Sequence, residues 1–158
     1  MMSNQRIPDI QLVKVKKTSK IAVVTAIWNQ DLTDNMLSEC LKTLKSYGLK
    51  PTSIRVSGSF ELIAATKNAF MKKYDAVIAL GVVLRGETPH FEYVSMAVTN
   101  GLTQIAAEVG KPIGFGILTC DNYQQAKDRA GFPGSIENKG QECATAVLQS
   151  ISEHKKLG

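Results

Sequence analysis

Short apolar runs alternate with longer amphipathic stretches four times along this chain. The apolar runs are rich in Val, Ile and Leu, which is typical of strands buried on both faces of a sheet. They lie at residues 21–27, 51–56, 75–84 and 112–119. Because a helical stretch follows each run, the pattern predicts strand–helix–strand units and therefore a parallel sheet with helices on both faces.

The helical stretches place apolar residues three and four positions apart, and Gly48 and Gly110 follow two of them as typical helix ends. Helices are predicted around residues 36–44 and over residues 60–71, 91–109, 123–130 and 137–151. The expected fold is a three-layer α/β/α sandwich with a flavodoxin-like four-stranded parallel sheet. It forms a single domain over residues 21–158. Residues 1–20 are expected to form an arm that pairs with a neighbouring subunit's sheet edge or stays free.

Charge narrows the choice of ligand. Lys and Arg number 19 against 14 Asp and Glu, which gives a net charge of +5 and favours an anionic ligand. A nucleic-acid module would interleave basic and aromatic residues on one face, whereas the surplus lysines here lie mainly near the two ends of the chain. No apolar run has the roughly 20 residues that a membrane helix needs. We therefore expect neither nucleic acid nor a membrane as a partner.

The three cysteines and residues 1–20 indicate the cellular compartment in which the protein is expected. Cys40, Cys120 and Cys143 are widely spaced and form no CxxC pair, which predicts buried free thiols rather than a disulfide or a metal site. Residues 1–20 are basic and lack the apolar stretch of a secretory signal, so a cytoplasmic location is expected.

Ligands of such sheets bind beyond the carboxyl ends of the strands, so the residues there are the candidates for a site. Trp28 and Asn29 follow the first strand, and Ser59, Phe60 and Glu61 follow the second. Trp28 offers a flat face for a heteroaromatic ring, or it is a core or interface aromatic. The Glu61 carboxylate accepts hydrogen bonds from a polyol or amine, or it caps the helix that begins there.

Residues 85–92 (RGETPHFE) follow the third strand and are the most informative segment. Gly86, Glu87 and Thr88 offer backbone N–H groups and a hydroxyl ahead of a helix, which suits an anion. An imidazole suits proton transfer near neutral pH, so His90 is a candidate proton donor and acceptor, or it is an ordinary surface histidine. Beyond the fourth strand, Arg129 and Lys139 suit a phosphate or are solvated cations.

Jointly these segments resemble the 6,7-dimethyl-8-ribityllumazine synthase family of riboflavin synthesis. Residues 81–94 (GVVLRGETPHFEYV) resemble the family signature, and residues 57–61 (SGSFE) resemble its PGAFE. Residues 27–29 (IWN), 116–119 (GILT), 125–131 (QAKDRAG) and 138–140 (NKG) match further motifs in order. The resemblance runs from residue 21 to about residue 150.

The resemblance implies a transferase without metal or cofactor. It would condense 5-amino-6-(D-ribitylamino)uracil with 3,4-dihydroxy-2-butanone 4-phosphate and release phosphate and water. His90 and Arg129 would be catalytic, with His90 moving protons. Gly86, Glu87, Thr88 and Arg129 would bind the phosphate. The pyrimidine and its ribityl chain would contact Trp28, Asn29, Ser59, Phe60, Glu61, Val82, Val83, Leu84, Phe115 from a neighbouring subunit, and Lys139.

Three residues depart from the family pattern. Ile27 replaces the usual Arg, Ser57 the usual Pro, and Trp28 the commoner Phe. Because residues 132–137 (FPGSIE) lengthen a connection that is shorter in the family's icosahedral shells, a homopentamer with sites between subunits is favoured over a 60-subunit shell. Riboflavin synthase is a candidate partner. The alternative is a non-catalytic flavin- or lumazine-binding protein of the same fold.

Overall fold

A computed structural model describes residues 14–158. Its strands are β1 (Ile21–Ala26), β2 (Thr52–Val56), β3 (Ala76–Leu84) and β4 (Ile113–Cys120). Its helices are α1 (Gln30–Ser46), α2 (Leu62–Met71), α3 (His90–Val109), α4 (Tyr123–Lys127) and α5 (Lys139–His154), with 3₁₀ turns η1 (Ser59–Glu61) and η2 (Lys155–Leu157). None of these helices is long and apolar enough to cross a membrane.

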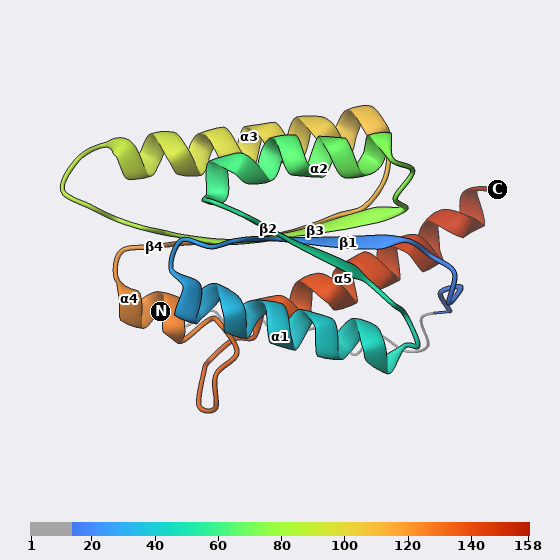
Figure 1. Ribbon diagram of the computed structural model, residues 1–158, viewed down its shortest axis with the longest axis horizontal. Helices are drawn as coiled ribbons and strands as arrows, with labels where there is room; N and C mark the ends of the chain where they lie inside the picture. The colour runs from blue at the N-terminus through green and yellow to red at the C-terminus, as the bar shows by residue number, and fades with distance from the viewer. Residues whose placement is uncertain (1–13) are drawn as a thin grey trace.

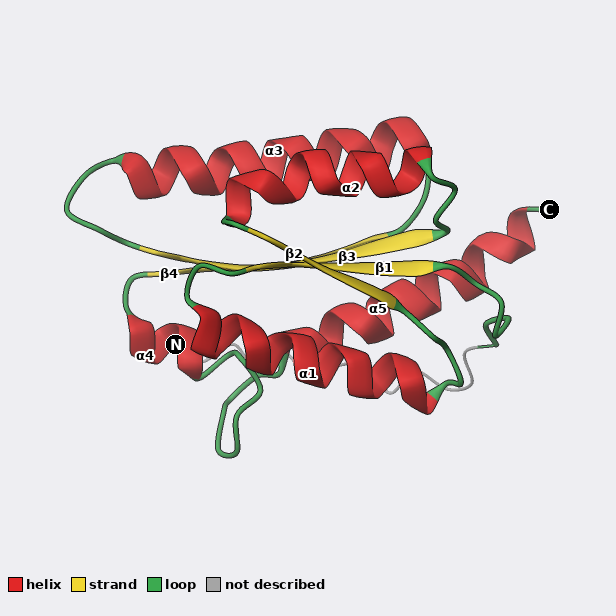
Figure 2. Cartoon of the chain, viewed as in Figure 1, coloured by secondary structure: helices red, strands yellow, loops and turns green. Residues whose placement is uncertain are grey.

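The four strands form one parallel sheet in the order β2-β1-β3-β4, which confirms the predicted flavodoxin-like sandwich. Helices α2 and α3 cover one face, and α1, α4 and α5 cover the other (Figure 1). Figure 2 shows the same three layers by type of structure. Because all strands run in one direction, their carboxyl ends share one edge, and the chain order switches direction between β1 and β3.

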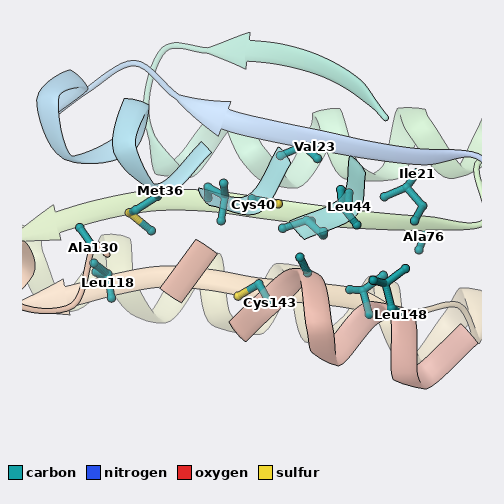
Figure 3. Packing of buried hydrophobic residues seen from close by; sticks show 14 of the residues in the cluster. Ile21, Val23, Met36, Cys40, Leu44, Ala76, Leu118, Ala130, Cys143 and Leu148 are labelled. Atoms are coloured by element: carbon teal, nitrogen blue, oxygen red, sulfur yellow. The ribbon is translucent and has the colours of Figure 1, made fainter. Parts of the chain in front are cut away.

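Each face of the sheet has its own core. Under α1 and α5 the core includes Met36, Cys40 and Leu44 of α1, which meet Cys143 and Leu148 of α5 (Figure 3). Under α2 and α3 a second core gathers Val24, Val77, Leu102 and others. Each large apolar side chain removed from water contributes about 1.5–3 kcal/mol. All three cysteines are free and buried, as expected.

Helix ends differ from the sequence expectation where side chains cap the backbone. The last helix begins at Lys139 rather than at residue 137, because the Asn138 side chain accepts from the Gln141 N–H at 3.1 Å. Helix α4 stops at Lys127, short of the predicted residue 130. The Asp128 carbonyl there accepts N–H groups from Ile136 and Glu137, which closes a projecting loop over residues 128–138 (Figure 1).

The predicted arm lies mostly outside the described residues, including Leu12 and Val13 of its expected strand. Within the described part, Val15 packs against the core under α1 and α5. The Lys17 side chain lies against Gly48 at the end of α1. Residues 15–17 therefore contact the chain's own domain.

Candidate active site

A cavity of about 790 Å³ opens at the carboxyl ends of β1 and β3, where the chain order switches direction. The sequence-predicted residues that line it are Trp28, Asn29, Ser59, Phe60, Glu61, Val82, Val83, Leu84, Gly86, Thr88 and His90. Residues that follow β1 and β2 thus meet residues from the end of β3 and the start of α3 around one space, as the parallel topology requires.

The segment after β1 is fixed by backbone bonds to the segment after β2. The Trp28 N–H donates to the Ser57 carbonyl at 3.0 Å. Asn29 adopts the left-handed conformation (φ 60°), and its side-chain amide donates to the Val82 carbonyl at 3.1 Å. The Trp28 side chain is 73% exposed, so its indole face is available to a ligand.

The 3₁₀ turn after β2 lies directly on β3. Ser59 is buried, and a β-carbon on Gly81 would lie 2.5 Å from the Ser59 Oγ, so only glycine allows this approach. The Glu61 Oε2 accepts the Gly58 N–H at 3.0 Å, which closes the turn. Within residues 14–158 the Glu61 Oε1 accepts no hydrogen bond and is left for a ligand.

The loop between β3 and α3 presents unused donors. Across the described part of the chain, the N–H groups of Gly86, Glu87 and Thr88 find no acceptor. The Thr88 hydroxyl accepts the His90 N–H at 3.4 Å. These groups precede a 20-residue helix, whose N-terminus favours an anion. His90 is exposed in the first turn of that helix, beside the cavity.

Four predicted site residues do not line this cavity: Glu87, Phe115, Arg129 and Lys139. Phe115 lies on the edge strand β4 and is 42% exposed. Arg129 follows α4, on the face covered by α1 and α5, whereas the cavity wall formed by α3 is on the other face. Their roles in the site stay predictions.

Arg129 and Lys139 share a carboxylate. The Glu137 side chain lies 3.8 Å from the Arg129 Nε and 3.6 Å from the Lys139 Nζ. Lys139 also donates to Glu142 at 2.8 Å. Burial alone would lower the pKa of Lys139, but the hydrogen bond to Glu142 and the charge of Glu137 outweigh it and raise that pKa.

The cavity also has walls that the sequence reasoning missed. They are formed by Gly58, Phe91, Tyr93, Val94 and Ala97. Val94 and Ala97 lie four and seven positions after His90, so helical spacing would have placed them on the His90 face of α3. That signal was present in the sequence.

Together the fold and the cavity define a flavodoxin-like α/β protein with a candidate site at the carboxyl ends of its strands. The family model for 6,7-dimethyl-8-ribityllumazine synthase matches residues 18–155. The chain belongs to this family, which confirms the resemblance and the transferase activity expected from the sequence.

Relatives named 6,7-dimethyl-8-ribityllumazine synthase match nearly the whole chain. The one from Pseudarthrobacter chlorophenolicus is 50% identical and covers 93% of this chain and 94% of its own. The one from Streptomyces coelicolor is 44% identical, and the match covers 96% of this chain and 98% of the relative. A solved GDP-L-fucose synthetase from Naegleria fowleri, bound to NADP, has a TM-score of 0.46 and 16% identity, covering 97% of this chain and 49% of its own.

Proposed function

We propose that this chain condenses 5-amino-6-(D-ribitylamino)uracil with 3,4-dihydroxy-2-butanone 4-phosphate to 6,7-dimethyl-8-ribityllumazine in the cytoplasm, releasing phosphate and water. The observation that carries the assignment is the meeting, in one cavity, of an exposed indole face, a free carboxylate oxygen and unused N–H donors beside His90.

Each group of residues that lines the cavity then has a role in binding or catalysis. Trp28 stacks on the pyrimidine, and Glu61 accepts hydrogen bonds from the ribityl chain or the amine. The donors of Gly86, Glu87 and Thr88 hold the phosphate. Because amine and ketone react readily once they are brought together, holding them in one orientation supplies most of the acceleration. His90 adds proton transfer during imine formation and phosphate loss.

The remaining residues complete the site from a second copy. Three predicted site residues lie outside the cavity, namely Phe115, Arg129 and Lys139. The aromatic side chains at the mouth of the cavity are strongly exposed, which is typical of a surface that packs against another subunit. We therefore place the catalytic centre between subunits of a homo-oligomer. The extended loop over residues 132–137 favours a pentamer over a 60-subunit shell, and riboflavin synthase remains a candidate partner.

The decisive experiment mixes purified protein with both substrates and follows lumazine absorbance. His90→Ala should lower kcat about a hundredfold, whereas Arg129→Ala should chiefly raise the KM for the phosphorylated substrate. Lumazine formation at only the spontaneous rate would instead support the non-catalytic binding protein. Native mass spectrometry on the same preparation tests the pentamer, and a mass near that of 60 subunits would refute it.

A further inference from the structure

Arg85 stands between the end of β3 and the anion loop, which we define as residues 86–90. Its backbone N–H donates to the Cys120 carbonyl at 2.9 Å. Its guanidinium donates from Nε to the Asp121 Oδ1 at 2.8 Å and from Nη1 to the Glu92 carboxylate. The guanidinium carbon lies 4.4 Å from the centre of the Phe91 ring.

These contacts close the anion loop. Arg85 immediately precedes the loop, and Phe91 and Glu92 immediately follow it in the first turn of α3. The side chain of Arg85 therefore joins the start of the loop to its end, and Asp121 ties both to the end of β4. Among the described residues, the bond from the His90 N–H to the Thr88 hydroxyl is the one hydrogen bond that joins two residues of the anion loop.

The charge of Arg85 is already matched by its neighbours. Hydrogen bonds to Asp121 and Glu92 raise the pKa of Arg85, and the bond from Arg85 lowers the pKa of Glu92. Arg85 also does not line the cavity. Its guanidinium is therefore committed to the protein rather than offered to a ligand.

We propose that Arg85 is a positioning residue that holds the anion loop in the shape that receives the substrate phosphate. The proposal rests on the proposed function, because that function supplies the phosphate. Arginine suits the task better than lysine, since its planar fork reaches two carboxylates while its face lies on an aromatic ring.

A residue that positions the loop can be distinguished from one that stabilises the whole domain, because only the second should lower the stability of the protein when it is removed. The side chains of Arg85, Glu92 and Asp121 are 45%, 50% and 62% exposed, and ion pairs this exposed add little to overall stability. Removing them should therefore disturb the loop without unfolding the domain.

The experiment compares Arg85→Lys, Arg85→Gln and Glu92→Gln with the parent chain. Glu153→Gln is the matched control, because Glu153 pairs with Lys156 on the surface at 3.0 Å and far along the chain from the loop. We expect the KM for 3,4-dihydroxy-2-butanone 4-phosphate to rise about tenfold in Arg85→Gln and several-fold in Arg85→Lys. The KM for the pyrimidine should change by less than about twofold.

Two results would overturn the proposal. One is an unchanged KM for the phosphorylated substrate in Arg85→Gln, and the other is an equal rise for both substrates with a lowered melting temperature. If Arg85→Gln does not fold, Glu92→Gln decides the question by the same kinetic comparison. A parent chain that makes no lumazine refutes the proposed function itself, so the two failures are distinguishable.

Discussion

Gly140 of α5 lies directly against the backbone carbonyl of Met36 in α1. A β-carbon at Gly140 would be 2.1 Å from that oxygen and 3.1 Å from the backbone nitrogen of Cys40. Backbone groups inside a helix cannot turn aside as a flexible side chain can. The two helices on this face therefore approach as closely as glycine permits.

Gly140→Ala should destabilise the domain. Alanine gains about 1 kcal/mol in helix propensity, but the overlap with a fixed carbonyl costs more, so we expect a net loss of about 2 kcal/mol or more. Urea unfolding measures it, with the exposed Gln149→Ala on the same helix as the control. Equal stabilities of Gly140→Ala and the parent would show that α1 and α5 can separate freely.

Riboflavin should quench the fluorescence of Trp28. The chain has one tryptophan, so the signal reports this side chain alone, and its exposed face at the cavity is free to stack on a flavin ring. We expect quenching that saturates with added riboflavin and weaker riboflavin binding by Trp28→Phe. Unchanged fluorescence at high riboflavin concentration would show that the Trp28 ring does not stack on a flavin.

Glu137→Gln should tighten phosphate binding. In the parent chain this carboxylate pairs with Arg129 and Lys139, so on the proposed site it would compete with the substrate phosphate for these cations. Because all three side chains are partly exposed, solvent screens the attraction, and we expect the KM for the phosphorylated substrate to fall about three- to tenfold. Inhibition by inorganic phosphate should strengthen in parallel, whereas the surface variant Glu153→Gln should leave both constants unchanged. An unaltered KM in Glu137→Gln would place the two cations away from the phosphate.

Stability should fall at alkaline pH because of two buried thiols. Burial raises the pKa of Cys143 to about 12, and it raises the pKa of Cys40 as well. Once the pH exceeds the ordinary thiol pKa, the unfolded chain loses these protons while the folded chain keeps them, so each thiol lowers the free energy of unfolding by about 1.4 kcal/mol per pH unit. The loss begins near pH 9 and ends near the folded pKa.

Urea unfolding at a series of alkaline pH values gives this slope. Cys143→Ala serves as the control, because it should remove the part of the decline that Cys143 causes. A flat dependence between the two pKa values would mean that the buried thiols ionise in the folded state.

The four strands followed from the sequence because buried parallel strands are continuous apolar runs, as in Ala76–Leu84. The cavity residues followed because parallel topology gathers the strand ends at one edge. The first inference needs only local patterns, and the second adds the general rule for parallel sheets to them.

Apart from the cavity residues of α3, which helical spacing could have placed, what sequence reasoning missed depends on contacts between residues that are not neighbours in the chain. The end of α4 is set by the Asp128 carbonyl, which binds N–H groups eight and nine positions later. The carboxylates around Arg85 come from α3 and from the end of β4, so no local pattern revealed them. The separation of Arg129 from the cavity likewise appears only once the layers are built.

A site shared between two copies of the chain should allow two defective alleles to complement each other. His90 lines the cavity of its own copy, whereas Arg129 follows α4 on the other face of the sheet and would reach only a neighbour's cavity on the proposed two-copy site. On the proposed two-copy site, a strain that carries His90→Ala on one allele and Arg129→Ala on another regains intact sites by mixing subunits, about one site in four if assembly is random. Two alleles that each fail alone would together restore riboflavin-independent growth.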